Sequence, residues 1–313
     1  MLEEKFVFKS FLAKLGHGGA KVDFVLDKSD YALGDSLRGE LIVQGGTVEQ
    51  QINRIDIELV MSIYHKDHYY TQTVGKIPFH TPFKIQPEER KSIPVSYVFP
   101  MNLLLSSSSI SYYFVSHLDI AGAVDSSDKD FVQVLPPLRL QNALIAFEQI
   151  GFYEKHDSRS FNGYLQEFEL KPTGMFKDQI EEVEFVVSLE ETGIRLLLEV
   201  DLYSFFGEKE IRREIWLDNP LCDDPTQLAT HLQEILTEMI QNPQSYVFHS
   251  AATQGIHKHT GFGIAAGAVG GVAAGLIAAE VIDEIGDALE DVFEGDEEEQ
   301  NFAADDFFDG DED

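Results

Sequence analysis

Apolar and polar residues alternate along much of the chain between residues 21 and 134. In the segment INRIDIELVMSIY five apolar residues share one parity from residue 55 to 63: Ile55, Ile57, Leu59, Met61 and Ile63. A period of two residues is typical of a β-strand with one face buried and the other in water. SLRGELIVQ has the same period and lies between the turn signals Gly34-Asp35 and Gly45-Gly46. The pattern therefore predicts a series of short strands.

Four more segments of this first block show the strand pattern: KVDFVL, SIPVSYVF, ISYYFVSHLDI and DFVQVL. A second block, from about residue 161 to 217, repeats it in EFEL, EEVEFVVSLEE, GIRLLLEVDLYSFF and IRREIWL. Short strands without helices between them are typical of antiparallel sandwiches. We therefore expect a mainly β protein with two sandwiches in tandem and a few short helices.

A period near four marks the expected helices. After Pro136-Pro137 the stretch LRLQNALIAFEQIGF carries an apolar stripe, namely Leu140, Leu144, Phe147 and Ile150, and is interpreted as a hinge helix between the domains. A closing helix is predicted after Asp224, which can cap it, with Pro225 in its first turn and a stripe formed by Leu228, Leu232, Ile235 and Met239. The opening segment predicts a short amphipathic helix with Leu2, Phe6, Phe11 and Leu15 on one face. It could pack on the protein's own sheet or on lipid.

These elements divide the chain into four parts. We expect an N-terminal sandwich with its amphipathic helix in residues 1–135, the hinge helix in 136–152, a C-terminal sandwich with its closing helix in 153–248, and a Gly/Ala-rich helical segment with an acidic, disordered tail in 249–313.

The segment GFGIAAGAVGGVAAGLIAA, residues 261–279, contains no charged residue. Its glycines recur every four residues at Gly263, Gly267, Gly271 and Gly275, so a helix would carry them in one groove, as in a glycine zipper. Such a groove permits close packing of a second helix. Membrane association through residues 261–282, self-association into a homo-oligomer in water, and disorder all stay open at this point.

Charge and cysteine content narrow the function further. The formal net charge is -32, and an acidic chain has no extended basic surface for phosphate backbones, so nucleic-acid binding is not expected. The single cysteine excludes an intrachain disulfide and fits a reducing compartment. We expect a cytoplasmic protein, with membrane association as the open alternative.

Catalytic motifs are not found: the sequence has no G-x-S-x-G, no H-E-x-x-H and no P-loop. His65, Asp67 and His68 are weak metal candidates, because a site would need a further ligand from elsewhere. The run DSSDKD offers Asp125, Asp128 and Asp130 but lacks the glycine and the final glutamate of a calcium loop, so we predict a turn between two strands. We expect no enzymatic activity and no cofactor.

Several separated blocks resemble one known family. They are GHGGAKVDFVLDKSDYALGDSLRGELIVQGGTVEQQINRIDIELV, HLDIAGAVDSSDKDFVQVLPP, LQNALIAFEQIGF and EFELKP, and they resemble the bacterial sporulation-control proteins of the stage zero, M type over roughly residues 1–245. The resemblance implies an arrestin-like fold of two immunoglobulin-type sandwiches. It also implies a non-catalytic cytosolic regulator that contacts other proteins, cell-division or cytoskeletal proteins among them, and it carries over no catalytic residue.

Three functions follow as hypotheses. The first is a scaffold or regulator that acts through protein–protein interaction, and its acidic body would attract basic partner surfaces. The second is a membrane-peripheral adaptor, anchored or oligomerised by the Gly-rich segment. The third, a metal or small-ligand binding protein, would use His65, Asp67 and His68.

Overall fold

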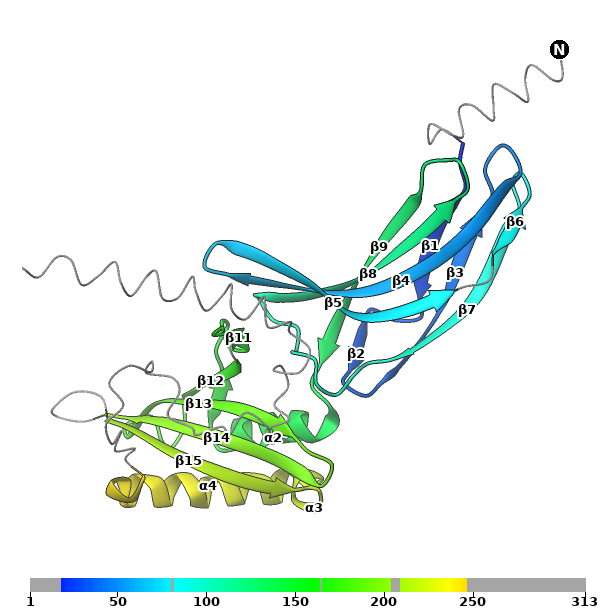
Figure 1. The fold of residues 1–313 in the computed structure, drawn as a ribbon. Helices are drawn as coiled ribbons and strands as arrows, with labels where there is room; N and C mark the ends of the chain where they lie inside the picture. Colours follow the sequence, from blue (N-terminus) through cyan, green and yellow to red (C-terminus); the bar gives the residue numbers. More distant parts are fainter. Residues whose placement is uncertain (1–17, 80–81, 164, 204–208, 247–313) are drawn as a thin grey trace, which may run out of the picture. The chain divides into compact units, whose positions relative to one another are not determined.

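The computed structural model describes residues 18–79, 82–163, 165–203 and 209–246, all of which belong to one compact unit (Figure 1). The predicted amphipathic helix in residues 1–15 and the Gly-rich segment with its acidic tail lie outside the described residues. Among the described residues the structure is mainly β with few helices, which confirms the prediction of a mainly β protein.

The first region, residues 18–135, is a sandwich of two sheets. The strands in its described residues are β1 (Lys21–Leu26), β2 (Asp30–Ala32), β3 (Ser36–Gln44), β4 (Gln50–His65), β5 (His68–Phe79), β6 (Phe83–Ile85), β7 (Arg90–Val98), β8 (Ile110–Ile120) and β9 (Ser126–Leu135). One sheet has the order β1-β3-β7, and the other has the order β2-β9-β8-β4-β5 with β6 paired to β4. All pairs are antiparallel except β2 with β9.

Aromatic side chains fill the space between these two sheets. Phe24 of β1 meets Phe114 of β8 edge to face, with ring centroids 5.4 Å apart. Tyr97 and Phe99 pack against the same Phe114 ring at 5.9 and 6.2 Å. Each of these contacts joins a residue of one sheet, or of the loop after it, to a residue of the other. The alternation of apolar residues along the strands therefore produces the core between the layers.

The second region begins with helix α2 (Leu138–Gln149) and contains one sheet. Its strands are β10 (Phe152–Glu154), β11 (Ser160–Phe161), β12 (Gln166–Pro172), β13 (Ile180–Leu189), β14 (Gly193–Leu202) and β15 (Lys209–Asp218). The order is β10-β12-β13-β14-β15, and β11 pairs with β12. The chain continues through α3 (Asn219–Cys222), α4 (Pro225–Gln241) and the short helix η1 (Pro243–Ser245).

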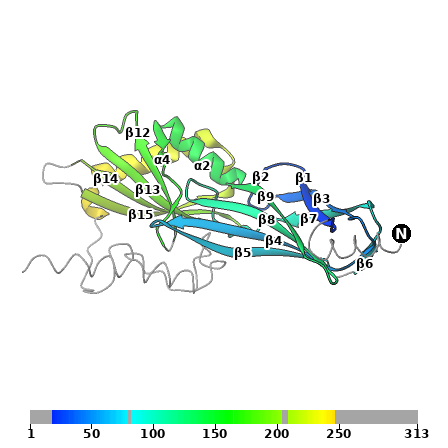
Figure 2. The same cartoon turned by 90° about the horizontal axis from the view of Figure 1, so that it is seen from above.

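Helices, not a second sheet, cover the apolar face of this sheet in the described part of the chain. Figures 1 and 2 show α2 and α4 together on one side of it. Phe185 of β13 stacks on Phe147 of α2 at 5.4 Å and on Phe168 of β12 at 4.9 Å. The second immunoglobulin-type sandwich predicted for residues 153–248 is therefore corrected to a sheet with a helical layer, because the two helical stripes supply the apolar cover.

Helix α2 is packed into the second region. The buried Asn142 side chain donates a hydrogen bond to the backbone oxygen of Cys222, at 2.8 Å, and the helix contacts α4. The segment predicted as a hinge helix is thus helical, and it is attached to the region that follows it. The closing helix begins where predicted: the Asp224 carboxylate accepts hydrogen bonds from the backbone N–H groups of Thr226 and Gln227.

Candidate functional site

Strands β4 and β5 form a long hairpin with a two-residue turn. His65 pairs with His68, and the turn residues Lys66 and Asp67 have positive φ angles of 46° and 64°. Two residues of positive φ between paired strands are typical of a type I′ turn, whose twist matches that of the flanking strands. The Tyr64 hydroxyl donates a hydrogen bond of 2.8 Å to Asp67, which holds the turn. We call residues 64–69 the hairpin tip.

Two tyrosines project from the hairpin tip into solvent. The Tyr64 and Tyr69 rings lie 4.8 Å apart, and these residues are 41% and 75% exposed. Tyrosine is enriched at protein interfaces because it offers a large rigid apolar surface with a polar end. The hairpin tip therefore has the side chains of a contact surface.

The three weak metal candidates of the hairpin tip point to different partners. The Asp67 carboxylate accepts from Tyr64, and the His68 Nδ1 atom lies 2.8 Å from the backbone oxygen of Lys66. The half-buried His65 ring lies beside the backbone of Phe161 in β11, and burial lowers the pKa of His65 below its ordinary value. Their ligand atoms do not gather into one of the clusters that could hold an ion. The geometry thus gives the metal hypothesis no support at these residues.

Carboxylates gather elsewhere in the first region. Asp23 of β1 lies with Asp128 and Asp130 of β9 so that their oxygens are within 4.8 Å of one another. Burial raises the pKa of Asp130 to about 7, and the Asp128 carboxylate adds to the rise. The predicted turn at DSSDKD is wrong: β9 begins at Ser126, and the turn before it contains Gly122, at a positive φ of 65°.

The misplaced turn has a local cause. The Asp125 carboxylate accepts a hydrogen bond from the backbone N–H of Ile120, at 3.1 Å, and so closes the loop between β8 and β9 before the run of acids is complete. Asp128 and Asp130 then fall on one parity of a strand. Their spacing of two residues was the signal in the sequence that could have placed them there.

A second group of carboxylates crosses the sheet of the second region, on the face opposite α2 and α4. Glu169, Glu184 and Glu199 stand directly opposite one another on β12, β13 and β14. Like charges in such register destabilise a sheet. Burial, together with the carboxylates of Glu167 and Glu199, raises the pKa of Glu184 to about 8.

Cations lie at both ends of this row. Lys155 bridges Glu169 and Glu182 at 2.5 and 2.8 Å, and although burial opposes it, these hydrogen bonds raise the pKa of Lys155. Arg212 pairs with Glu199 at 2.9 Å and with Glu210. Burial also raises the pKa of Glu199, to about 7, although Arg212 opposes the rise.

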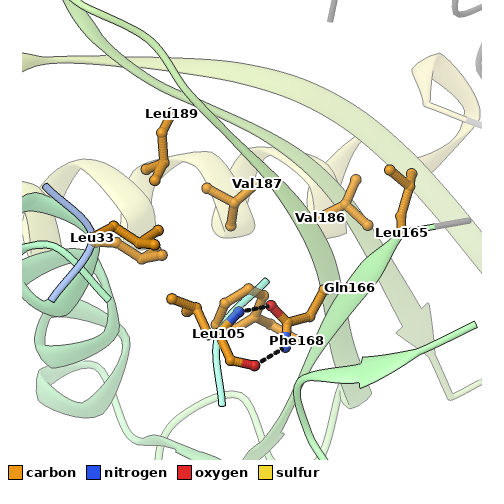
Figure 3. A pocket seen from close by; sticks show the side chains of 9 residues that line it. Leu33, Leu105, Leu165, Gln166, Phe168, Val186, Val187 and Leu189 are labelled. Atoms are coloured by element: carbon orange, nitrogen blue, oxygen red, sulfur yellow. Dashed lines mark hydrogen bonds between the residues drawn. The ribbon is translucent and has the colours of Figure 1, made fainter. Parts of the chain in front are cut away.

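The two regions meet at a hollow lined mainly by apolar side chains (Figure 3). Its lining consists of Leu33, Leu105, Leu140, Leu165, Gln166, Phe168, Val186, Val187 and Leu189, and it encloses about 350 Å³ including the part open to solvent. Gln166 is its polar member. Figure 3 shows the Gln166 amide bonded twice to the backbone of Leu105.

Comparison with known proteins identifies the family to which this chain belongs. A sequence model described as "SpoOM protein" matches residues 8–203, which is more than half of the chain and includes the hairpin tip, the carboxylate row and the hollow. The chain belongs to the Spo0M family.

A curated sequence and a crystal structure that resemble this chain both carry the Spo0M name. "Sporulation-control protein spo0M" of Bacillus subtilis (strain 168) is 29% identical over 252 residues, which cover 74% of this chain and 98% of that protein. The crystal structure of Spo0M from Bacillus subtilis matches with a TM-score of 0.57 and 28% identity, covering 71% of this chain and 99% of the other. The predicted resemblance is confirmed.

The Spo0M match ends before the segment that contains Gly263, Gly267, Gly271 and Gly275. Those glycines lie outside the described residues, so the glycine zipper stays a prediction. Within the described part of the chain, none of the helices has the length and apolar character that crossing a membrane requires.

Proposed function

We propose that this Spo0M family member is a non-catalytic regulator, of the sporulation-control kind, that acts by binding other proteins. The observation that carries the proposal is the hairpin tip, which presents Tyr64 and Tyr69 on two long paired strands. Strands of 16 and 12 residues give the tip a rigid support, so little conformational freedom is lost when a partner binds.

Charge indicates the kind of partner. The formal net charge of -32 attracts proteins with basic surfaces and repels nucleic acid. The resemblance to sporulation-control proteins adds cell-division or cytoskeletal proteins as the classes to examine. No cofactor is part of the proposal, and the carboxylate groups described above are assigned no catalytic role.

Affinity capture with the full chain tests the proposal. Tyr69→Ser should reduce recovery of the specific partners by about tenfold or more, since binding hot spots, in which tyrosine is enriched, cost about 2 kcal/mol or more when truncated. Tyr203→Ser is the matched control, because Tyr203 is an exposed tyrosine, 56% accessible, in the second region. Equal recovery by wild type and both variants would count against the hairpin tip as the binding surface. A capture without reproducible partners would count against the whole proposal.

We place the protein in the cytoplasm in this proposal, in keeping with its single cysteine, which is buried. Fractionation of cells that make the full chain, compared with a chain lacking residues 261–313, separates this location from membrane association through residues 261–282. The cytoplasmic proposal predicts that both proteins stay in the soluble fraction. Sedimentation of the full chain with membranes, lost on deletion, would favour the adaptor hypothesis instead.

A further inference from the structure

One buried polar side chain joins the two regions at their junction. Gln166, at the first position of β12, is 6% exposed. Its Oε1 atom accepts a hydrogen bond of 2.8 Å from the backbone N–H of Leu105, and its Nε2 atom donates to the backbone oxygen of Leu105 at 2.9 Å. The same Nε2 atom donates to the backbone oxygen of Arg159, also at 2.9 Å. One amide therefore pairs with both backbone groups of a residue in the other region.

The loop that receives Gln166 is itself fixed to the first region. The buried Tyr112 hydroxyl donates to the backbone oxygen of Leu104 at 2.7 Å. On the other side of Leu105, the Ser106 N–H donates to the backbone oxygen of Val134, and the Val134 N–H donates to the Ser106 hydroxyl. Leu105 is thus held on a rigid support, and its hydrogen bonds to Gln166 join two fixed bodies.

The covalent connection between the regions is short. Strand β9 ends at Leu135 and α2 begins at Leu138, so Pro136 and Pro137 alone lie between them. Helix α2 moves with the second region, because Asn142 and Phe147 attach it there. A change in the relative orientation of the regions would therefore pivot at the two prolines and break the contacts of Gln166.

The surfaces that meet around Gln166 are apolar. Leu33 and Leu105 come from the first region, and Val187 and Leu189 come from the second. A second contact between the regions lies beside Gln166. Its partner in the sheet is Phe161 of β11, and the backbone of Phe161 lies beside His65 of the hairpin tip. Opening the junction would expose the leucines and, in the same movement, would separate His65 from β11.

We propose that Gln166 is a latch that holds the two β regions in one orientation, and that breaking its hydrogen bonds to Leu105 allows them to rotate about Pro136-Pro137. The closed state is the one in which both hydrogen bonds between Gln166 and Leu105 are formed. In the open state the apolar side chains of the hollow are accessible, so the protein has a second surface that exists only when the latch is released. The hairpin tip loses its contact with β11 in the same step.

Hydrogen exchange in the full chain tests the latch at its own bond. In Gln166→Ala the Leu105 N–H loses its acceptor, and its exchange should accelerate about 10- to 100-fold, as expected when hydrogen bonds of ordinary strength are removed. Gln179→Ala is the matched control, because Gln179 is an exposed glutamine of the same region. It should leave exchange at Leu105 unchanged.

Spin-label distances separate opening from a local loss of one hydrogen bond. Labels on Ser127→Cys and Thr192→Cys lie at exposed positions of the first and second regions. Cys222 need not be replaced, since burial raises the pKa of its thiol to about 11 and keeps it unreactive. The latch predicts one narrow distance distribution in the otherwise unmodified protein and a broad or shifted one in Gln166→Ala.

A narrow distribution that is identical in both proteins would overturn the proposal, and so would a broad one before any change at Gln166. If Gln166→Ala does not fold, Gln166→Glu replaces it. The glutamate keeps the length and the acceptor oxygen but, when ionised, cannot donate to Leu105 or Arg159. It should broaden the distribution at neutral pH, and an unchanged narrow distribution in the folded Gln166→Glu protein would likewise contradict the latch.

Discussion

Each region of the molecule buries the apolar face of a sheet, but the two regions cover that face with different layers. In the first region both layers of the core are sheets, and Phe114 is surrounded by aromatic rings of the opposite layer. In the second region one sheet is covered by helices, and Phe185 lies between a helix ring and a strand ring. Alternating strands thus require an apolar cover without determining whether it is a sheet or a helix.

The polar faces differ as well. The carboxylates of the first region come from two sheets, from β1 and β9, whereas those of the second lie in one sheet, in a row across β12, β13 and β14 with cations at its ends. Burial raises the pKa of Asp130 in the first region, and it raises the pKa values of Glu184 and Glu199 in the second. The difference is that the row is a consequence of strand register, while the group depends on the closeness of the two sheets.

Core truncation should have the largest effect and should show whether the regions unfold separately. Phe114→Ala and Phe185→Ala should each lower the free energy of unfolding by about 3–5 kcal/mol, because each removes a large buried ring. Trp216, the only tryptophan, lies in β15 and reports on the second region, whereas circular dichroism reports on both. Phe185→Ala should shift the fluorescence transition more than Phe114→Ala does.

The reverse order of the two fluorescence shifts would contradict separate cores. Coincident transitions in every variant would show instead that the junction makes the two regions unfold as one unit. Val98→Ala is a suitable control, since Val98 is 59% exposed, and it should leave both transitions within about 0.5 kcal/mol of wild type.

The raised carboxyl pKa values predict a second, pH-dependent effect. Folded Glu184, with a pKa of about 8, holds a proton that the unfolded chain loses near its ordinary value of 4.5, so stability falls as the pH rises between these values. Glu184→Gln removes this loss of stability at high pH. After screening by solvent at this partly exposed face, it should stabilise the protein by about 1–2 kcal/mol at pH 9 and leave it unchanged at pH 4.

Asp130→Asn sharpens the comparison between the two carboxylate arrangements. The pH range in which folded Asp130 loses stability should lie lower, between the ordinary pKa of 3.8 and about 7. The gain in stability from Asp130→Asn should therefore be complete by pH 8. Denaturant unfolding from pH 4 to 9 measures both pH ranges. A gain from Glu184→Gln that is the same at every pH would contradict the account of the carboxylate row.

Removal of a helix cap should have the smallest effect. Asp224→Ala should lower the free energy of unfolding by about 1 kcal/mol, because two backbone N–H groups at the start of α4 lose their acceptor. The neighbouring exposed Asp223→Ala is the control and should change stability by less than about 0.5 kcal/mol. Thermal unfolding measured by circular dichroism distinguishes the two, and equal shifts would mean that the cap contributes nothing specific.

Some elements could be predicted from the sequence because one physical rule determines them. The segment predicted for β8 has the observed bounds Ile110–Ile120, since every second position of it is apolar or aromatic except Ser116. Strand β5 follows no such pattern, because much of it is exposed on both faces at the edge of its sheet, and it was not predicted. Periodicity detects burial, so an exposed edge strand escapes it.

Parts of the candidate site depend on contacts that no local pattern specifies. Glutamates recur along β12, β13 and β14, but only the register places Glu169, Glu184 and Glu199 opposite one another. Gln166 is one polar residue at the start of a strand, and its importance comes from Leu105, 61 positions earlier in the chain. The tyrosines of the hairpin tip were visible in the sequence beside the histidines, but their exposure was not.

Photocrosslinking at the hairpin tip tests the central claim, that this region contacts protein partners, most directly. A benzophenone amino acid introduced at Tyr69 in the full chain, and at Tyr203 as the comparison position in the second region, is activated in living cells. The account predicts discrete crosslinked products of defined mass from position 69 and none of comparable yield from position 203. Equal yields from both positions, or no product from position 69, would contradict it.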